Sequence, residues 1–223
     1  MIVAIHQPNY LPYLGFFRKA ALADVFVLYD TAQYSKNELH NRNRIKTPRG
    51  MQWLTVPVRR AGKRPIGEVE IAYETRWARR HIKALAANYR GAPHYEAYAP
   101  EIAAILSKDW TRLADLNTDL IARIARWLGL RTRFMRASEL PGPPTQDPTE
   151  KIIHLTRAAG GDMYLSGPGG RDYLNPEKFR EVGLRFSDFT ARPYPQMYGV
   201  FMPNLSVVDA LLNVGEATRD FLA

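Results

Sequence analysis

Short apolar runs that alternate with amphipathic stretches dominate the hydrophobic and polar pattern of this chain. Residues 2–6 and 25–29 form two such apolar runs, and residues 13–22 between them follow a helical period. A strand, a helix and a second strand in this order predict a βαβ unit with parallel strands and a right-handed crossover. We therefore expect an α/β fold with a mostly parallel sheet.

The rest of the chain continues this alternation around a helical middle part. Further strands are predicted at residues 53–58, 68–71, 131–136, 162–166 and 184–189, whereas the polar residues 30–50 are predicted to form a loop. Helices are predicted at residues 75–91, 100–107, 110–128, 149–159, 176–182, 205–213 and 215–222. Their expected N-caps include Thr75, Thr149 and either Asn204 or Ser206, with Asp209 as a capping-box partner. We expect one α/β domain over residues 1–223, with residues 75–128 as a helical lobe or insertion.

The composition narrows the class of protein. The chain has 223 residues, of which 46% are hydrophobic, and this is enough to bury a core. It has no cysteine, which excludes a disulfide scaffold, a thiolate nucleophile and a zinc site with sulfur ligands. No apolar run approaches the roughly 20 residues that span a bilayer, and residues 1–6 lack the features of a signal peptide. We therefore expect a cytoplasmic protein.

The net charge of +9 indicates an affinity for anions. This positive charge favours polyanions, nucleotides, phosphosugars or an acidic surface as partners. The alternative is that the arginines only make the exposed faces of helices soluble. The basic residues are scattered rather than gathered in a tail, and this argues against nucleic acid as the partner.

The opening segment, residues 5–12, carries a dense set of polar side chains directly after the first strand. Ligands of open α/β sheets bind at the carboxyl ends of the strands. We expect His6 to act there as an acid–base or phosphate-contacting group, and Gln7, Asn9 and Tyr10 to add uncharged hydrogen-bonding groups. The alternative is a plain turn in which the histidine bonds the local backbone.

A second polar group follows the second strand and would share the same edge of the sheet. Asp30 could orient His6 or bind a hydroxyl or an amine, and Arg42 could bind a carboxylate or phosphate with both guanidinium nitrogens. Further binding candidates in this segment are Gln33, Lys36, Asn41 and Asn43. The alternative is that Asn41-Arg42-Asn43 has no binding role, because asparagine and arginine are common in loops.

A third group follows the strand predicted at residues 162–166. Its glycines permit close approach of the backbone to a ligand, although the spacing is neither that of a Walker A loop nor G-x-G-x-x-G. The candidates here are Ser166, Gly167, Arg171, Asp172 and Tyr173, joined later in the chain by Gln196. The alternative is a tight turn between secondary-structure elements.

The sequence contains no set of residues with the spacing of metal ligands and no G-x-S-x-G motif, so no metal site is expected. The remaining histidines are isolated and are expected on surfaces or helix faces: His40, His81, His94 and His154.

Residues over essentially the whole chain resemble the WbqC-like family. The resemblance rests on Ile5-His6-Gln7-Pro8-Asn9-Tyr10-Leu11-Pro12, Gly15-Phe16-Phe17, Lys19, Asp24-Val25-Phe26, Asp30, Gln33-Tyr34, Asn41-Arg42-Asn43, Ile45-Lys46, Trp53-Leu54-Thr55-Val56-Pro57, Tyr164-Leu165-Ser166-Gly167, Tyr173-Leu174, Tyr194-Pro195-Gln196 and Leu205-Ser206 to Asp209. Thr31 stands where the family usually has a second acidic residue, and Leu39-His40 where an aromatic residue is common. The first departure weakens any scheme with two carboxylates or a metal. The resemblance implies a role in O-antigen biosynthesis, where such proteins are thought to help acylate or aminoacylate amino sugars.

The first strands are also similar to the start of nucleotidyltransferase-like folds, and residues 26–34 to a segment of pantothenate synthetases. Those enzymes activate a carboxylate as an adenylate and pass it to an amine, which would imply ATP as a co-substrate here. The His-x-Gly-His motif of such enzymes is absent.

Our leading hypothesis is an acyl- or aminoacyltransferase, or an amide ligase, that acts on a nucleotide-linked amino sugar. His6 and Asp30 would be catalytic, whereas Lys36, Arg42 and Arg171 would bind phosphate or carboxylate. The rival hypothesis is a non-catalytic protein that binds a nucleotide-sugar or a glycosyltransferase partner.

Overall fold

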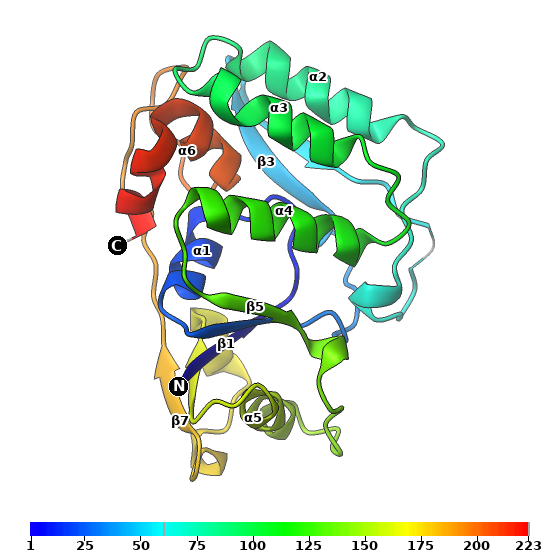
Figure 1. Ribbon diagram of the computed structural model, residues 1–223, viewed down its shortest axis with the longest axis vertical. Helices are drawn as coiled ribbons and strands as arrows, with labels where there is room; N and C mark the ends of the chain where they lie inside the picture. Colours follow the sequence, from blue (N-terminus) through cyan, green and yellow to red (C-terminus); the bar gives the residue numbers. More distant parts are fainter. Residues whose placement is uncertain (60, 223) are drawn as a thin grey trace.

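The computed structural model describes residues 1–59 and 61–222, and within these a five-stranded parallel sheet forms the centre of the fold (Figure 1). Its strands lie in the order β5-β2-β1-β6-β7, and every neighbouring pair is parallel. The bounds are β1 (Ile2–His6), β2 (Val25–Leu28), β5 (Arg133–Arg136), β6 (Met163–Ser166) and β7 (Gly183–Phe186). The prediction of an α/β fold with a mostly parallel sheet is confirmed.

Helices cover both faces of this sheet, because its central strands are apolar on both sides. On one face, helix α1 (Leu14–Ala21) packs on β2, with the ring centroids of Phe16 and Phe26 4.9 Å apart. On the other face, helix α5 (Pro148–Ala158) packs on β1 and β6 through a separate apolar cluster that includes Ile5 and Ile152. Parallel sheets generally need both faces covered in this way.

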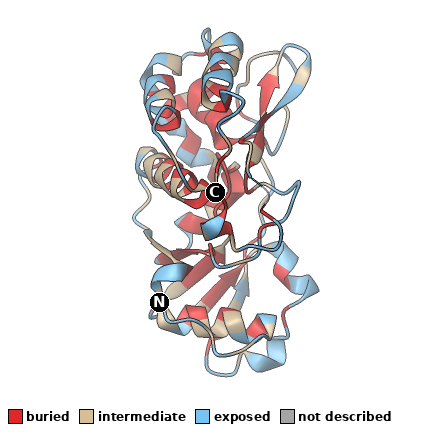
Figure 2. Ribbon diagram, turned by 90° about the vertical axis from the view of Figure 1, so that its right-hand side faces the viewer, coloured by how far each residue is buried: buried red, intermediate tan, exposed pale blue. Residues whose placement is uncertain are grey.

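The chain between β2 and β5 forms a largely helical part that is continuous with the α1 face of the sheet (Figure 2). It contains the hairpin β3 (Arg42–Thr47) and β4 (Gly50–Thr55), η1 (Ile66–Glu68), α2 (Trp77–Tyr89), α3 (Tyr95–Leu106) and α4 (Leu113–Trp127). Helix α6 (Val207–Val214) returns to this part from the end of the chain. Short 3-10 helices complete the fold: η2 (Ala137–Glu139), η3 (Pro168–Asp172), η4 (Pro176–Lys178) and η5 (Gly215–Leu222). No helix of the described ranges is long and apolar enough to cross a membrane.

Several predicted elements differ from the structure. The predicted loop 30–50 contains β3. This strand was missed because its residues are mostly polar or charged, although buried Asn43 and Ile45 alternate with half-buried arginines. Residues 68–71 make only isolated bridges, and the predicted helix 176–182 is reduced to η4. The first two expected caps were wrong, since Arg76 precedes α2 and Asp147 caps α5 through Glu150 N.

The N-cap of α6 was predicted correctly in part. The Ser206 hydroxyl accepts a hydrogen bond from Val208 N at 3.3 Å. Asp209 does not complete a capping box, because its carboxylate accepts bonds from the buried hydroxyl groups of Tyr89 and Tyr194 at 2.6 and 2.8 Å. It therefore ties α6 to α2 rather than to its own first turn.

Buried amides hold the opening loop 7–13 in place between β1 and α1. Asn117, fully buried on α4, donates from Nδ2 to the carbonyl oxygens of Pro8 and His40 at 2.9 and 2.8 Å. Asn43 on β3 donates from Nδ2 to Leu11 O at 2.7 Å. Because buried carbonyls need partners, these bonds determine where the loop lies relative to the sheet.

We predict that Asn117→Ala lowers the free energy of unfolding by about 2–3 kcal/mol, since it leaves two buried carbonyl groups without a donor. Urea unfolding would measure the change. The matched control is Asn88→Ala, because the amide of Asn88 bonds only Ala84 O within its own helix. Equal effects of the two substitutions would contradict the role given to Asn117.

Candidate functional site

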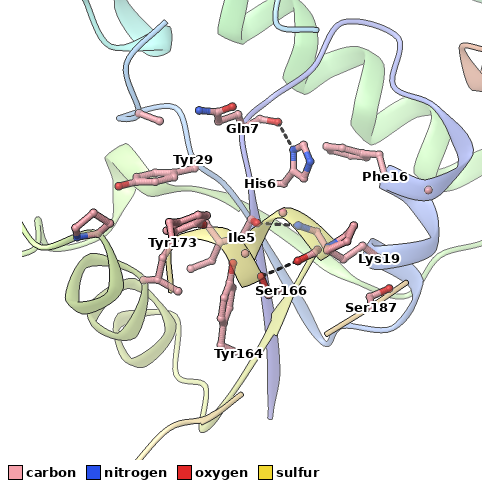
Figure 3. A pocket seen from close by; sticks show the side chains of 18 of the residues that line it. Ile5, His6, Gln7, Phe16, Lys19, Tyr29, Tyr164, Ser166, Tyr173 and Ser187 are labelled. Carbon is pink, nitrogen blue, oxygen red and sulfur yellow. Dashed lines mark hydrogen bonds between the residues drawn. The ribbon is translucent and has the colours of Figure 1, made fainter. Parts of the chain in front are cut away.

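A cavity of about 830 Å³ lies at the carboxyl ends of the central strands (Figure 3). Its walls come from the ends of β1 and β6, from α1, from the start of α5, and from the segments that follow β2 and β7. From β1 the chain moves outward to β2 and β5, whereas β6 and β7 lie on the other side of β1. The strand order thus reverses between β1 and β6, and open α/β sheets bind ligands at such a reversal.

Lys19 is the most unusual side chain in this cavity. It lies on the face of α1 that packs on the sheet, and it is only 5% exposed. Its Nζ donates to Ile5 O at 2.9 Å and lies 5.6 Å from the centroid of the Phe26 ring. Burial lowers the pKa of Lys19 to about 7, because the ammonium form loses its hydration.

Lys19 was not predicted as a site residue from the sequence. The available signal was its position, three residues after Phe16 and directly before Ala20, on the buried face of the helix. A lysine placed among apolar helix positions is rarely buried without a reason.

The lining of the cavity contains no acidic side chain within the described part of the chain. Two lysines contribute to it, Lys19 from α1 and Lys151 from α5. The ammonium group of Lys151 is bonded to Gln146 Oε1 at 2.9 Å. A cavity with this charge balance favours an anionic ligand.

His6 ends β1 and presents a neutral ring to the cavity. Its Nδ1 lies 2.9 Å from Gln7 O, and since a carbonyl oxygen only accepts, Nδ1 carries the proton. Burial, with the nearby charge of Lys19, lowers the pKa of His6 to about 3. Nε2 is therefore a hydrogen-bond acceptor, which suits an amine or hydroxyl group better than a phosphate.

The glycine loop after β6 closes one wall. Ser166 is buried, and Gly170 N donates to Gly167 O at 3.1 Å as the chain turns into η3. A Cβ atom at Gly170 would lie 2.0 Å from Ser166 Oγ, so no larger residue fits without moving the serine.

Three tyrosines form the aromatic end of the cavity. Tyr29 follows β2, Tyr164 lies on β6, and Tyr173 follows η3 with 53% of its surface exposed. In Figure 3, Tyr29 and Tyr173 lie on the opposite side of Ile5 from Lys19. The cavity therefore holds Lys19 on one side of Ile5 and an aromatic wall on the other.

Six of the residues predicted from the sequence line this cavity: His6, Gln7, Gln33, Ser166, Gly167 and Tyr173. The structure does not bring the others into it. Among these, Lys36 and Asp172 are exposed, and Arg171 forms a bidentate ion pair with Asp188 at 2.8 and 3.0 Å. Arg42 stacks on Trp53, with its Cζ 4.3 Å from the ring centroid, and its guanidinium also bonds Asn37 O.

Asp30 is buried outside the cavity lining and is fully engaged by the protein. Its carboxylate accepts bonds from Arg136 Nε at 2.9 Å, from Ser138 N at 2.9 Å and from Ser138 Oγ at 2.6 Å. Arg136 also binds Asp115 at 2.7 Å. The group joins the loop after β2 to the end of β5 and to α4, so it supports the site from behind.

The remaining predicted residues are buried in the interior, except for Gln196, which is half-buried. The Tyr10 hydroxyl group bonds His81 Nδ1 at 2.8 Å, and Asn41 donates to Val56 O at 2.7 Å. Asn9 is buried, Asn43 holds the opening loop as described above, and Gln196 accepts a bond from Lys46 at 3.0 Å.

The expectation that the isolated histidines lie on surfaces or helix faces was wrong for His40, which is buried outside any helix, whereas His81 lies on the inward face of helix α2. His40 and His81 are buried, and His40 Nε2 bonds Gln7 Oε1 at 2.8 Å. Burial lowers the pKa of both. No cluster of His, Asp and Glu side chains that could hold a metal ion occurs within residues 1–59 and 61–222.

We predict that Asp30→Ala lowers the free energy of unfolding by about 2–4 kcal/mol, since it leaves Arg136 and Ser138 N without their partner. Thermal and urea unfolding would measure this loss. Thr31→Ala, at an exposed neighbour that lines the cavity, is the control. A variant at Asp30 as stable as the wild type would contradict a supporting role.

We predict that Lys19→Met makes the protein more stable near pH 7 and that this advantage shrinks toward pH 10. The pKa of Lys19 falls from 10.5 to about 7 on folding, so between these values the unfolded chain binds more protons. Wild-type stability then rises with pH by up to about 1.4 kcal/mol per unit, and the variant lacks this rise.

Urea unfolding of both proteins at several pH values would check this difference, with Lys151→Met as the control. An advantage that is constant with pH, or one that Lys151→Met reproduces, would contradict the burial of Lys19.

Comparison with known proteins agrees with the sequence resemblance. The family model described as the WbqC-like protein family matches residues 7–221. An uncharacterized protein of Mycobacterium tuberculosis, Rv1507c, is 39% identical over 226 residues, which covers 99% of this chain and 96% of the relative. No solved structure matched the chain. The chain belongs to the WbqC-like protein family.

Proposed function

We propose that this protein forms an amide on a nucleotide-linked amino sugar, as an acyl- or aminoacyltransferase of surface-polysaccharide (O-antigen) biosynthesis. The observation that carries this proposal is the cavity at the strand-order reversal, which holds the buried Lys19 on one side of Ile5 and Tyr29 and Tyr173 on the other. Its volume of about 830 Å³ lies within the range of sites for small molecules. Such a substrate would place the protein in the cytoplasm.

His6 is suited to receive the acceptor amine. Its unprotonated Nε2 can accept a hydrogen bond from an amino group, and its pKa of about 3 keeps the ring neutral at physiological pH. Gln7 and Gln33, which line the same cavity, offer amide groups to sugar hydroxyls. His6 would thereby orient the nitrogen that attacks the acyl carbon.

The reaction would join this nitrogen to the acyl carbon as the bond between that carbon and its activating group breaks. The amine nitrogen loses a proton to water, and the activating group leaves with the bonding electron pair. An acyl thioester or an acyl adenylate would supply the activated carbon, and ATP would be the co-substrate in the second case. The cavity lining offers no carboxylate to act as a base, which leaves the neutral His6 ring to face the amine.

We predict that UDP-glucosamine binds about fivefold or more tightly than UDP-glucose, because a charged amine donates a hydrogen bond to His6 Nε2 that is about 1 kcal/mol stronger than the bond from a hydroxyl group. UDP-N-acetylglucosamine, whose nitrogen is already acylated, should lose this preference. Isothermal titration calorimetry would measure the three affinities.

His6→Ala should remove the preference for the amino sugar without removing affinity for the nucleotide part. His154→Ala is the matched control, because this histidine of α5 bonds Pro141 O and is not part of the cavity lining. Failure of all three ligands to bind the wild-type protein would overturn the proposed function.

A second candidate is a non-catalytic protein that binds a nucleotide-sugar or a glycosyltransferase. The exposed face of α2 favours this alternative, since it gathers Arg76, Arg79, Arg80 and Lys83. A basic face of this kind could meet an acidic partner or membrane surface. Retention of surface-polysaccharide synthesis in cells that carry His6→Ala, together with its loss for charge-reversed α2, would favour this candidate.

A further inference from the structure

The ammonium group of Lys19 lacks a counter-charge in the free protein. Its hydrogen bond goes to a neutral carbonyl, Ile5 O, and no carboxylate of the described chain forms an ion pair with it. A buried charge without a partner is costly, and it either loses its proton or attracts an opposite charge. The open space next to this group is the cavity itself.

The groups that face Lys19 from the surrounding elements do not supply an opposite charge. His6 on β1 is neutral, and burial raises the pKa values of the two tyrosines that line the cavity from the start of α1 and from β6, Tyr13 and Tyr164. Ser187, after β7, is uncharged, and the neighbouring Asp188 is exposed and paired with Arg171. A ligand is therefore the available source of negative charge.

The backbone around Lys19 suits an oxyanion. The loop after β6 passes beside the amine, since a Cβ atom at Gly167 would lie 4.0 Å from Nζ. The glycines of this loop leave backbone groups open to the cavity. A phosphate placed here would contact both Nζ and the backbone of the loop. The lysine ammonium group binds phosphate as a compact point charge.

We propose that Lys19 is the phosphate-binding residue of this cavity, and that a nucleotide binds with its phosphate at Lys19 and its rings against Tyr29, Tyr164 and Tyr173. The bound phosphate draws one proton onto Nζ, so that nucleotide binding and proton uptake are coupled. This inference rests on the proposed function for its choice of ligand, and it adds the group that recognises the nucleotide.

The sign of the coupling follows from the electrostatics. In the free protein burial lowers the pKa of Lys19 to about 7, so near pH 8 most molecules carry a neutral amine. A phosphate in contact with Nζ stabilises the ammonium form and raises the pKa. Binding near pH 8 therefore takes up a proton, whereas near pH 6 the amine is already charged and uptake disappears.

The experiment is isothermal titration calorimetry of UMP with the full chain near pH 8 and near pH 6. Two buffers of small and large ionisation enthalpy, neither of them phosphate, would report the number of protons taken up. We expect an uptake that approaches one proton per UMP near pH 8 and that disappears or turns into a release near pH 6, because the phosphate of UMP, with a second pKa of about 6, itself loses a proton on binding there. Uridine, which lacks the phosphate, should bind with no uptake and at least about tenfold more weakly.

Lys19→Met should weaken UMP binding by about tenfold or more, abolish the proton uptake and leave uridine binding unchanged. Lys151→Met removes a charge from the same cavity but should preserve the uptake. Thermal unfolding would show that both variants are folded.

Equal affinity and equal uptake in the wild type and Lys19→Met, or absence of UMP binding, would overturn this inference. The two proposals can fail separately. UMP binding with Lys19-dependent uptake, but with no preference for UDP-glucosamine, supports Lys19 and overturns amide formation. A preference for UDP-glucosamine without Lys19-dependent proton uptake supports the amino-sugar function and shows that Lys19 does not bind the phosphate.

Discussion

The pairing of β1 with β2 on one side and with β6 on the other is the constraint on which the site depends. Since all three strands are parallel, their carboxyl ends meet at one edge. This brings together His6, Tyr29 and Ser166, residues that lie far apart in the sequence. Apolar residues on both faces of β1 and β2 hold this pairing between α1 and α5, so the positions of the polar groups follow from the packing of the core.

A shell of buried polar side chains shapes the loops around that edge. Asn43 and Asn117 hold the opening loop through its carbonyl groups, and Asp30 joins the loop after β2 to β5. Each of these side chains is engaged by protein atoms. Their contribution to function is therefore the position of His6 and of the loop after β2, because the carboxylate of Asp30 is fully bonded and the two asparagines are buried away from the cavity.

The sequence was informative where periodicity and connection order determine structure. The runs 2–6 and 25–29 predicted the parallel sheet, and the strand ends predicted that His6 and Ser166 lie near each other. Sequence patterns report which residues are polar but not where their bonding partners lie. Asp30 illustrates this, because its carboxylate accepts hydrogen bonds from residues 136 and 138, which lie more than 100 positions away. Lys19 is a second case, because it is buried among apolar side chains that the sequence does not place next to it.

The two apolar clusters that flank the sheet meet at the cavity. Phe16 belongs to the cluster on the α1 face, whereas Ile5, Ile152 and Tyr164 belong to the cluster on the α5 face, and all four line the same space. A ligand that fills this space contacts both clusters at once. Part of its binding free energy would then go into coupling the two faces of the sheet, so that the bound protein unfolds as a more cooperative unit than the free one.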